Sequence, residues 1–120
     1  MANLEKYQGS CHCGDVKFEV DLDLSGGVIS CNCSMCGRAG ALLTFAPPTQ
    51  FTLLAGDDAT RDYQFNKHVI HHLFCTKCGI KSYSWGTDKQ GNKQYAINVR
   101  CLDGVDPDSL KINKWDGKNH

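Results

Sequence analysis

Short stretches in which apolar and polar residues alternate run through most of the chain. In Val16-Lys17-Phe18-Glu19-Val20 every second residue is apolar, which is the period of a strand with one buried face. Further short apolar or aromatic runs lie at 28–29, 41–45, 51–53, 63–65, 69–74, 82–85 and 95–99. No apolar pattern with the 3.6-residue period of a helix is sustained. The pattern predicts a mainly β fold of several small twisted antiparallel sheets with little helix.

Turn residues separate these runs and leave no room for a linker. Gly26-Gly27, Pro47-Pro48 and Gly56-Asp57-Asp58 each interrupt an apolar stretch, as expected for connections between short strands. The chain has 120 residues and no internal repeat, so we expect residues 1–120 to form a single domain. A domain of this size buries only about two-thirds of its unfolded surface, so its apolar core is limited.

Charge adds little to this picture. Thirteen basic and thirteen acidic side chains cancel, so the composition offers no footprint for nucleic acid or for an anionic membrane. The first residues, Met1-Ala2-Asn3-Leu4-Glu5-Lys6, contain neither the basic nor the apolar region of a secretory signal. We therefore expect a cytoplasmic protein, whose thiols stay reduced.

The chain contains eight cysteines, far more than a chain of this length ordinarily carries, so they need a specific explanation. Seven of them fall in tight groups, Cys11-His12-Cys13, Cys31-Asn32-Cys33-Ser34-Met35-Cys36 and Cys75-Thr76-Lys77-Cys78, while Cys101 stands alone. Closely spaced thiolates on one turn suit a tetrahedral zinc ion, whereas a disulfide needs a wider, specific separation. A glycine after the last cysteine of each group, Gly14, Gly37 and Gly79, would let the turn bend. An iron–sulfur cluster uses the same ligands.

Counting ligands gives a simple partition. Two cysteine pairs make one closed four-thiolate site, and the triplet makes a site with an open position, as structural and catalytic zinc sites respectively require. The partition places Cys11, Cys13, Cys75 and Cys78 around one zinc ion and Cys31, Cys33 and Cys36 around a second, labile one. Spacing alone also allows Cys31 and Cys33 to pair with Cys75 and Cys78, and Cys101 to close the second site.

These cysteine motifs resemble a known family. Gly9-Ser10-Cys11-His12-Cys13-Gly14-Asp15-Val16, the central cysteine triplet, Phe74-Cys75-Thr76-Lys77-Cys78-Gly79 and Asn98-Val99-Arg100-Cys101-Leu102-Asp103 are similar to successive segments of the glutathione-dependent formaldehyde-activating enzymes, the group that includes the centromere protein V domain. The resemblance covers residues 7–115. One departure is the order Cys36-Gly37-Arg38, since many members carry a basic residue directly after the last cysteine.

The resemblance implies a fold of small sheets held by a structural zinc ion on Cys11, Cys13, Cys75 and Cys78, with a labile zinc ion on the catalytic residues Cys31, Cys33 and Cys36. It implies a carbon–sulfur lyase that acts on the adduct of formaldehyde with glutathione, or of another small aldehyde with another small thiol. A non-enzymatic zinc-stabilised binding module is the alternative, with Cys101 closing the second site. A zinc-regulated redox sensor is a third, weaker hypothesis for the function.

Several charged side chains are candidates for the chemistry around the second zinc. A cation should bind the carboxylates of a glutathione-like ligand, and Arg38, Arg61 and Arg100 are the candidates. His71 and His72 adjoin the third cysteine motif and should lie on opposite faces of a strand, so that one is packed and the other exposed. His12, between two ligands, should face away from the metal. Trp85 and Tyr95 should line the core or a pocket.

Overall fold

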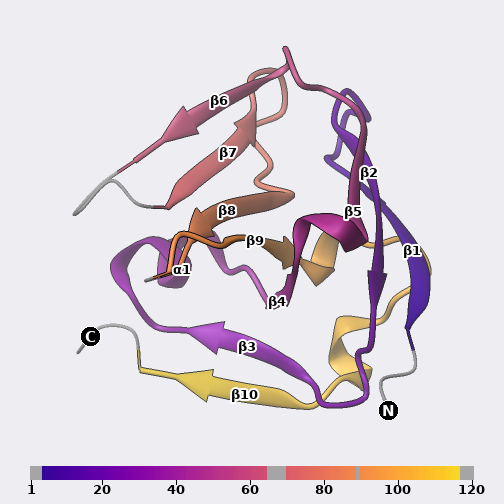
Figure 1. Ribbon diagram of the computed structural model, residues 1–120, viewed down its shortest axis with the longest axis vertical. Helices are drawn as coiled ribbons and strands as arrows, with labels where there is room; N and C mark the ends of the chain where they lie inside the picture. The colour runs from indigo at the N-terminus through magenta and orange to yellow at the C-terminus, as the bar shows by residue number, and fades with distance from the viewer. Residues whose placement is uncertain (1–3, 65–69, 89, 117–120) are drawn as a thin grey trace.

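The computed structural model describes residues 4–64, 70–88 and 90–116, and their strands form two sheets (Figure 1). The smaller sheet has the strand order β1-β2-β5 and the larger one the order β10-β3-β4-β9-β8-β7-β6. The strands are β1 (Glu5–Ser10), β2 (Lys17–Leu22), β3 (Val28–Cys31), β4 (Leu43–Ala46), β5 (Phe51–Ala55), β6 (Thr60–Tyr63), β7 (His71–Cys75), β8 (Tyr83–Thr87), β9 (Lys93–Asn98) and β10 (Ile112–Trp115). The prediction of a mainly β fold is confirmed.

The smaller sheet is built around the strand whose alternation was clearest in the sequence. In β2 the side chains of Phe18, Val20 and Leu22 are buried, while the residues between them are more exposed. Both its neighbours, β1 and β5, run antiparallel to it. Gly9 of β1 lies opposite Phe18, and a Cβ atom there would come within 2.4 Å of the Phe18 ring. The small residue therefore lets β1 cross the core and carry the loop of the first cysteine pair.

An aromatic cluster joins the two sheets. Phe18 stacks on Phe51 of β5 at a ring separation of 5.5 Å, and Phe51 stacks on Tyr95 of β9 at 4.1 Å. Tyr83 of β8 completes the cluster, 4.9 Å from Phe51. The smaller sheet thus covers one face of the larger sheet, and its burial of aromatic rings supplies much of the apolar stabilisation.

The opposite face of the larger sheet is lined by residues that alternate with this core. Phe74 and Asn98 each follow a residue that pairs with a core residue of the neighbouring strand. Because successive side chains of a strand point to opposite faces, the side chains of Phe74 and Asn98 project to the other side of the sheet. The helix α1 (Ser34–Ala39) lies on that side, since its Met35 and Ala39 share a surface hollow with Phe74 and Asn98. The core and the central cysteine motif are therefore on opposite faces of one sheet.

Three elements were not predicted from the sequence. The strands β1 and β10 were not predicted because few of their side chains are buried, so their sequences show little apolar alternation. The pairing of β10 with β3 is parallel, which departs from the expected antiparallel sheets. The helix α1 has six residues and none is buried, so no apolar period marks it.

The 3₁₀ turns are η1 (Pro48–Gln50), η2 (Val99–Cys101) and η3 (Pro107–Ser109).

The strands expected at 63–65 and 69–74 fall partly outside the described residues, which exclude Phe65 and Val69. Within the described part, β6 ends at Tyr63 and β7 begins at His71. The strand β7 ends at Cys75 and so delivers the third cysteine motif, as the sequence indicated. Along the described residues, no helix is both long enough and apolar enough to cross a membrane.

Candidate metal centres

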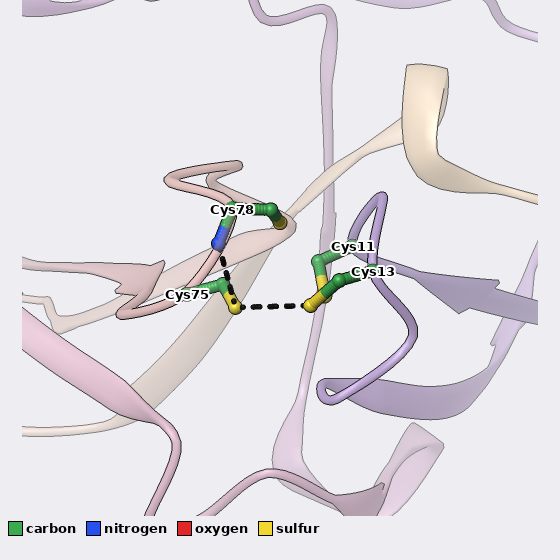
Figure 2. Close-up of side chains that lie close together, drawn as sticks. All are labelled: Cys11, Cys13, Cys75 and Cys78. Atoms are coloured by element: carbon green, nitrogen blue, oxygen red, sulfur yellow. Dashed lines mark hydrogen bonds between the residues drawn. The ribbon is translucent and has the colours of Figure 1, made fainter.

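The structure brings the first and third cysteine motifs together. Cys11 and Cys13 lie in the loop after β1, and they face Cys75 at the end of β7 and Cys78 in the turn that follows (Figure 2). All four sulfur atoms lie within 4.8 Å of one another. The Sγ atoms of Cys13 and Cys75, 62 residues apart in sequence, are separated by 3.5 Å, and those of Cys11 and Cys13 by 3.6 Å. We call these four residues the first cluster.

These separations suit a shared metal ion. A disulfide requires about 2.05 Å between sulfur atoms, and all eight cysteines are free thiols. The edge of a tetrahedron with Zn–S bonds near 2.3 Å is roughly 3.8 Å, close to the spacing in the first cluster. The four sulfur donors could therefore hold one tetrahedral ion with no open position.

Backbone geometry at the first cluster stabilises thiolates. Gly14 and Gly79 have φ values of 86° and 78°, so both turns bend through the left-handed region that favours glycine. The Sγ atom of Cys75 accepts hydrogen bonds from the backbone N–H groups of Lys77 and Cys78 at 3.4 and 3.5 Å. Backbone donors lower the pKa of the Cys78 thiol to about 6, the N–H of Cys13 contributing most. Such donors favour the charged form that binds metal.

The central motif forms a separate group. Cys31 ends β3, Cys33 caps the N-terminus of α1 and Cys36 lies in its first turn. Their three sulfur atoms lie within 4.8 Å of one another, and we call these residues the second cluster. The pairing of Cys31 and Cys33 with Cys75 and Cys78, which spacing allowed, is not the arrangement found.

Local backbone geometry also explains how three sulfur atoms converge within six residues. The Sγ atom of Cys33 accepts the backbone N–H of Cys36 at 3.3 Å, and the Sγ atom of Cys31 accepts that of Cys33 at 3.5 Å. The expectation that Gly37 bends this turn was wrong, because Gly37 lies inside α1. The bend falls at Gly40, whose φ is 68°. The helical turn replaces the glycine turn seen at the first cluster.

Two thiols of the second cluster have pKa values shifted in opposite directions. Burial raises the pKa of the Cys36 thiol to about 12, and the neighbouring Cys33 adds to the increase. Burial also acts to raise the pKa of the Cys33 thiol, but hydrogen bonds from Cys36 and Cys31 outweigh it and lower that pKa. Of these two thiols, that of Cys33 is therefore the more acidic. A divalent ion bound at the second cluster would favour the thiolate form of its ligands.

Two hollows flank the helix α1, and Met35 lines both. One, of about 230 Å³, lies between the helix and Tyr63 of β6 and includes Arg38. The other has a volume of about 260 Å³. Its principal lining residues are Met35, Ala39, Phe74, Ile80, Lys81 and Asn98. We call it the Lys81 hollow.

Cys101 belongs to neither cluster in the described part of the chain. It lies in the turn η2, and burial raises the pKa of its thiol, with further contributions from Cys11 and Cys78. Cys101 is therefore a neighbour of the first cluster. It is not placed to close the second.

Comparison with known proteins agrees with this arrangement. The family model described as glutathione-dependent formaldehyde-activating enzyme matches residues 6–115, which include both clusters. The chain belongs to this family. Its fold is also similar to the crystal structure of a Rhodobacter sphaeroides protein determined as a structural-genomics target, with a TM-score of 0.79 and 33% sequence identity. That match covers 90% of this chain and 98% of the other.

The three arginines that the sequence suggested as ligand-binding cations have different surroundings in the structure. Arg38 is exposed on α1, and its Nη1 atom donates to the Ser34 carbonyl at 3.0 Å. Arg100 is exposed and donates from Nε to the Gly40 carbonyl at 3.2 Å. Arg61 is exposed on β6. Of the three, only Arg38 lines a hollow beside α1.

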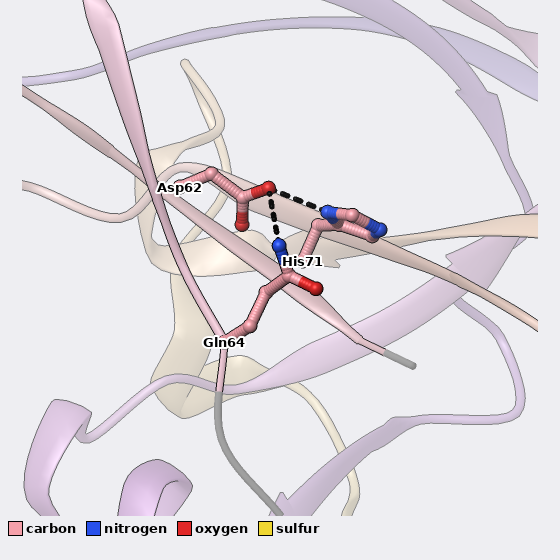
Figure 3. Close-up of polar contacts among 3 residues, drawn as sticks. All are labelled: Asp62, Gln64 and His71. Atoms are coloured by element: carbon pink, nitrogen blue, oxygen red, sulfur yellow. Dashed lines mark hydrogen bonds and ion pairs between the residues drawn. The ribbon is translucent and has the colours of Figure 1, made fainter. Parts of the chain in front are cut away.

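The two adjacent histidines lie on opposite faces of β7, as expected. His72 is buried, and burial together with the charge of Lys81 lowers its pKa to about 4, so its ring is neutral. His71 is only half-buried, and its Nδ1 atom donates to Asp62 at 2.5 Å. The Nε2 atom of Gln64 donates to the same carboxylate at 3.2 Å (Figure 3). This group faces away from the second cluster.

Of the remaining expectations, those for Tyr95 and His12 agree with the structure, whereas Trp85 belongs neither to the core nor to a hollow beside α1. Trp85 stacks on the His71 ring at 3.8 Å, and Lys93 lies over both Trp85 and Tyr95. Tyr95 packs against the core. His12 is exposed. None of these residues lines either hollow beside α1, whereas Lys81, which does, was not singled out in the sequence. No motif marks it, because Lys81 lies between β7 and β8 and only the tertiary packing brings it beside α1.

Proposed function

We propose that this protein is a zinc-dependent carbon–sulfur lyase that acts on the adduct of a small aldehyde, such as formaldehyde, with glutathione or another small thiol. The observation that carries the proposal is the difference between the two clusters. The first offers four sulfur donors, whereas the second offers three, and Met35, which lies between Cys33 and Cys36 in sequence, lines an open hollow. Closed sites support folds, and three-ligand sites leave a position for substrate. Family membership supports the choice of substrate class.

The roles of the clusters follow from this difference. Cys11, Cys13, Cys75 and Cys78 would hold a structural zinc ion, which joins the loop after β1 to the end of β7. Cys31, Cys33 and Cys36 would hold a labile, catalytic one. Zinc at the second cluster supplies an open coordination position and lowers the pKa of a thiol that binds there. We place this chemistry in the cytoplasm, where free thiols persist.

The reaction balances without an oxidant or reductant. In the direction of synthesis, the thiol sulfur bonds to the aldehyde carbon, the carbonyl π bond breaks, and the thiol proton ends on the new hydroxyl oxygen. The lyase direction reverses each step. The chain contributes by orienting the thiol: α1 holds Cys33 and Cys36, and the apolar wall of the Lys81 hollow, Met35 and Phe74, restricts water beside it. This positioning lowers the entropic cost of bringing the two reactants together.

The test is turnover by the zinc-loaded protein. Proton NMR should show exchange between free formaldehyde with glutathione and S-hydroxymethylglutathione that is faster than in a matched protein-free solution. Several small aldehydes should be compared. Exchange at the protein-free rate with every aldehyde and thiol would contradict the proposal and favour a zinc-stabilised binding module. That alternative relied on Cys101 closing the second cluster, and Cys101 lies beside the first.

A further inference from the structure

The Lys81 hollow contains one feature that the proposed chemistry does not use. Lys81 follows the turn of the first cluster by three residues, yet its charge acts on the second. Its side chain is half-buried beside α1 and lines the hollow with Phe74 and Asn98. Burial lowers the pKa of Lys81, while the thiols of the second cluster act in the opposite direction. An ammonium group thus lines the hollow and interacts electrostatically with the sulfur atoms of the second cluster.

Lys81 retains unused hydrogen-bonding capacity. An ammonium group has three donors and no acceptor. One donor reaches the Nδ1 atom of His72 at 3.3 Å, and that ring is neutral and accepts it. Among the described residues, Lys81 forms no ion pair with a carboxylate. Two donors therefore remain for a ligand in the hollow.

The other polar residue that lines the Lys81 hollow, Asn98, already forms hydrogen bonds within the protein. The Nδ2 atom of Asn98 donates to the backbone carbonyl of Lys81 at 3.1 Å, and its Oδ1 atom accepts the backbone N–H of Arg100 at 3.2 Å. The backbone N–H of Asn98 also donates to the Ser82 carbonyl at 3.0 Å. Asn98 thus fixes the backbone that carries Lys81 and leaves Lys81 to recognise the ligand. The rest of the wall has no polar side chain and consists of Met35, Ala39, Phe74, Gly79 and Ile80.

We propose that Lys81 is a specificity-determining residue of the second cluster and binds a carboxylate that its thiol ligand carries a few bonds from the sulfur. The inference rests on the proposed function, since it assumes that a thiol binds at this cluster. The inference narrows the substrate class to small thiols that carry a carboxylate. A short aliphatic segment between the thiol and the carboxylate would lie against the apolar wall of the Lys81 hollow. A charge-assisted pair of hydrogen bonds to the ammonium group fixes the orientation of the thiol.

Binding to the cobalt-loaded protein tests this inference without turnover. Cobalt absorption in the visible range changes when a thiol joins three cysteine ligands, and the closed first cluster does not respond. The matched ligands are 3-mercaptopropionate and 3-mercaptopropionamide, which have the same chain length and end in a charged carboxylate and a neutral amide respectively. The variants are Lys81→Met and Lys81→Gln, which remove the charge, and Lys81→Arg, which keeps it. Lys111→Met is the control, because Lys111 is exposed and it accepts the hydrogen bond from the backbone N–H of Val28 through its backbone carbonyl.

The wild type and Lys111→Met should bind the carboxylate more tightly than the amide, and Lys81→Arg should retain part of that preference. In Lys81→Met and Lys81→Gln the affinity ratio should fall by roughly tenfold, the effect expected for losing hydrogen bonds to a charged group. An unchanged ratio in both neutral variants would overturn the inference and leave thiol binding intact. No spectral change with either thiol in the wild type would contradict thiol binding itself, and with it the proposed function.

Discussion

Cys78→Ser should abolish the folded state at neutral pH. Serine preserves the size of the side chain but replaces a good zinc ligand with a poor one, so the first cluster loses its closed donor set. Structural zinc contributes roughly 10–16 kcal/mol in zinc-finger peptides, comparable to the about 5–15 kcal/mol that stabilises a whole domain. Circular dichroism, soluble yield and thermal unfolding measure the effect. We expect little soluble protein and no cooperative transition.

Cys101→Ser is the matched control for that experiment. Cys101 is half-buried near Cys11 and Cys78, yet it belongs to neither cluster in the described part of the chain. The same chemical change at this position should leave a cooperative transition and retain the tightly bound zinc. A Cys78→Ser protein that unfolds at the wild-type temperature would show that the first cluster does not hold the fold. Loss of the tight zinc in Cys101→Ser would show that the partition of ligands is wrong.

Cys33→Ala should keep the fold and remove the activity. The first cluster is untouched, so the expected loss of stability is limited to the N-cap of α1, about 1 kcal/mol. Turnover should fall more than about 100-fold. Loss of a residue that only hydrogen-bonds to a metal ligand already lowers metal affinity or activity by about 10–100-fold. The NMR exchange assay and thermal unfolding measure the two effects on one preparation.

Ser34→Ala is a suitable control for Cys33→Ala. Ser34 is the next residue along the chain, is exposed and begins α1, but it carries no sulfur donor. It should retain both turnover and the second metal. Wild-type turnover in Cys33→Ala would exclude the second cluster as the catalytic site. Unfolding of Cys33→Ala with retention of the fold in Ser34→Ala would instead assign the second cluster a structural role.

The sequence predicted the features that depend on local pattern. The alternation in 16–20 predicts a half-buried strand, and β2 buries Phe18, Val20 and Leu22. Ligand spacing within each cysteine motif suggested which sulfur atoms meet, because residues two or three apart on a turn cannot separate far. Both successes concern interactions within a few residues of the chain.

The features that were missed depend on contacts between distant segments or on very short elements. The strand β10 exists because it pairs with β3 across more than eighty residues, and its own pattern is mostly exposed. Gly37 looked like Gly14 and Gly79 in sequence, but the cap formed by Cys33 places it in a helix. Lys81, which lies between β7 and β8, shares a hollow with Met35 and Ala39 of α1 through the tertiary packing. No signal adjacent to it in sequence specifies that neighbour.

The most direct test of the account is the rate at which a chromogenic chelator removes zinc from the fully loaded wild type. The account predicts about two equivalents that leave in two separate phases, since three ligands hold zinc less tightly than four. Circular dichroism should stay constant through the fast phase and change only in the slow one, and Cys33→Ala should lack the fast phase. Release of all the zinc in one phase, with the fold lost in step, would contradict the division into a labile and a structural site.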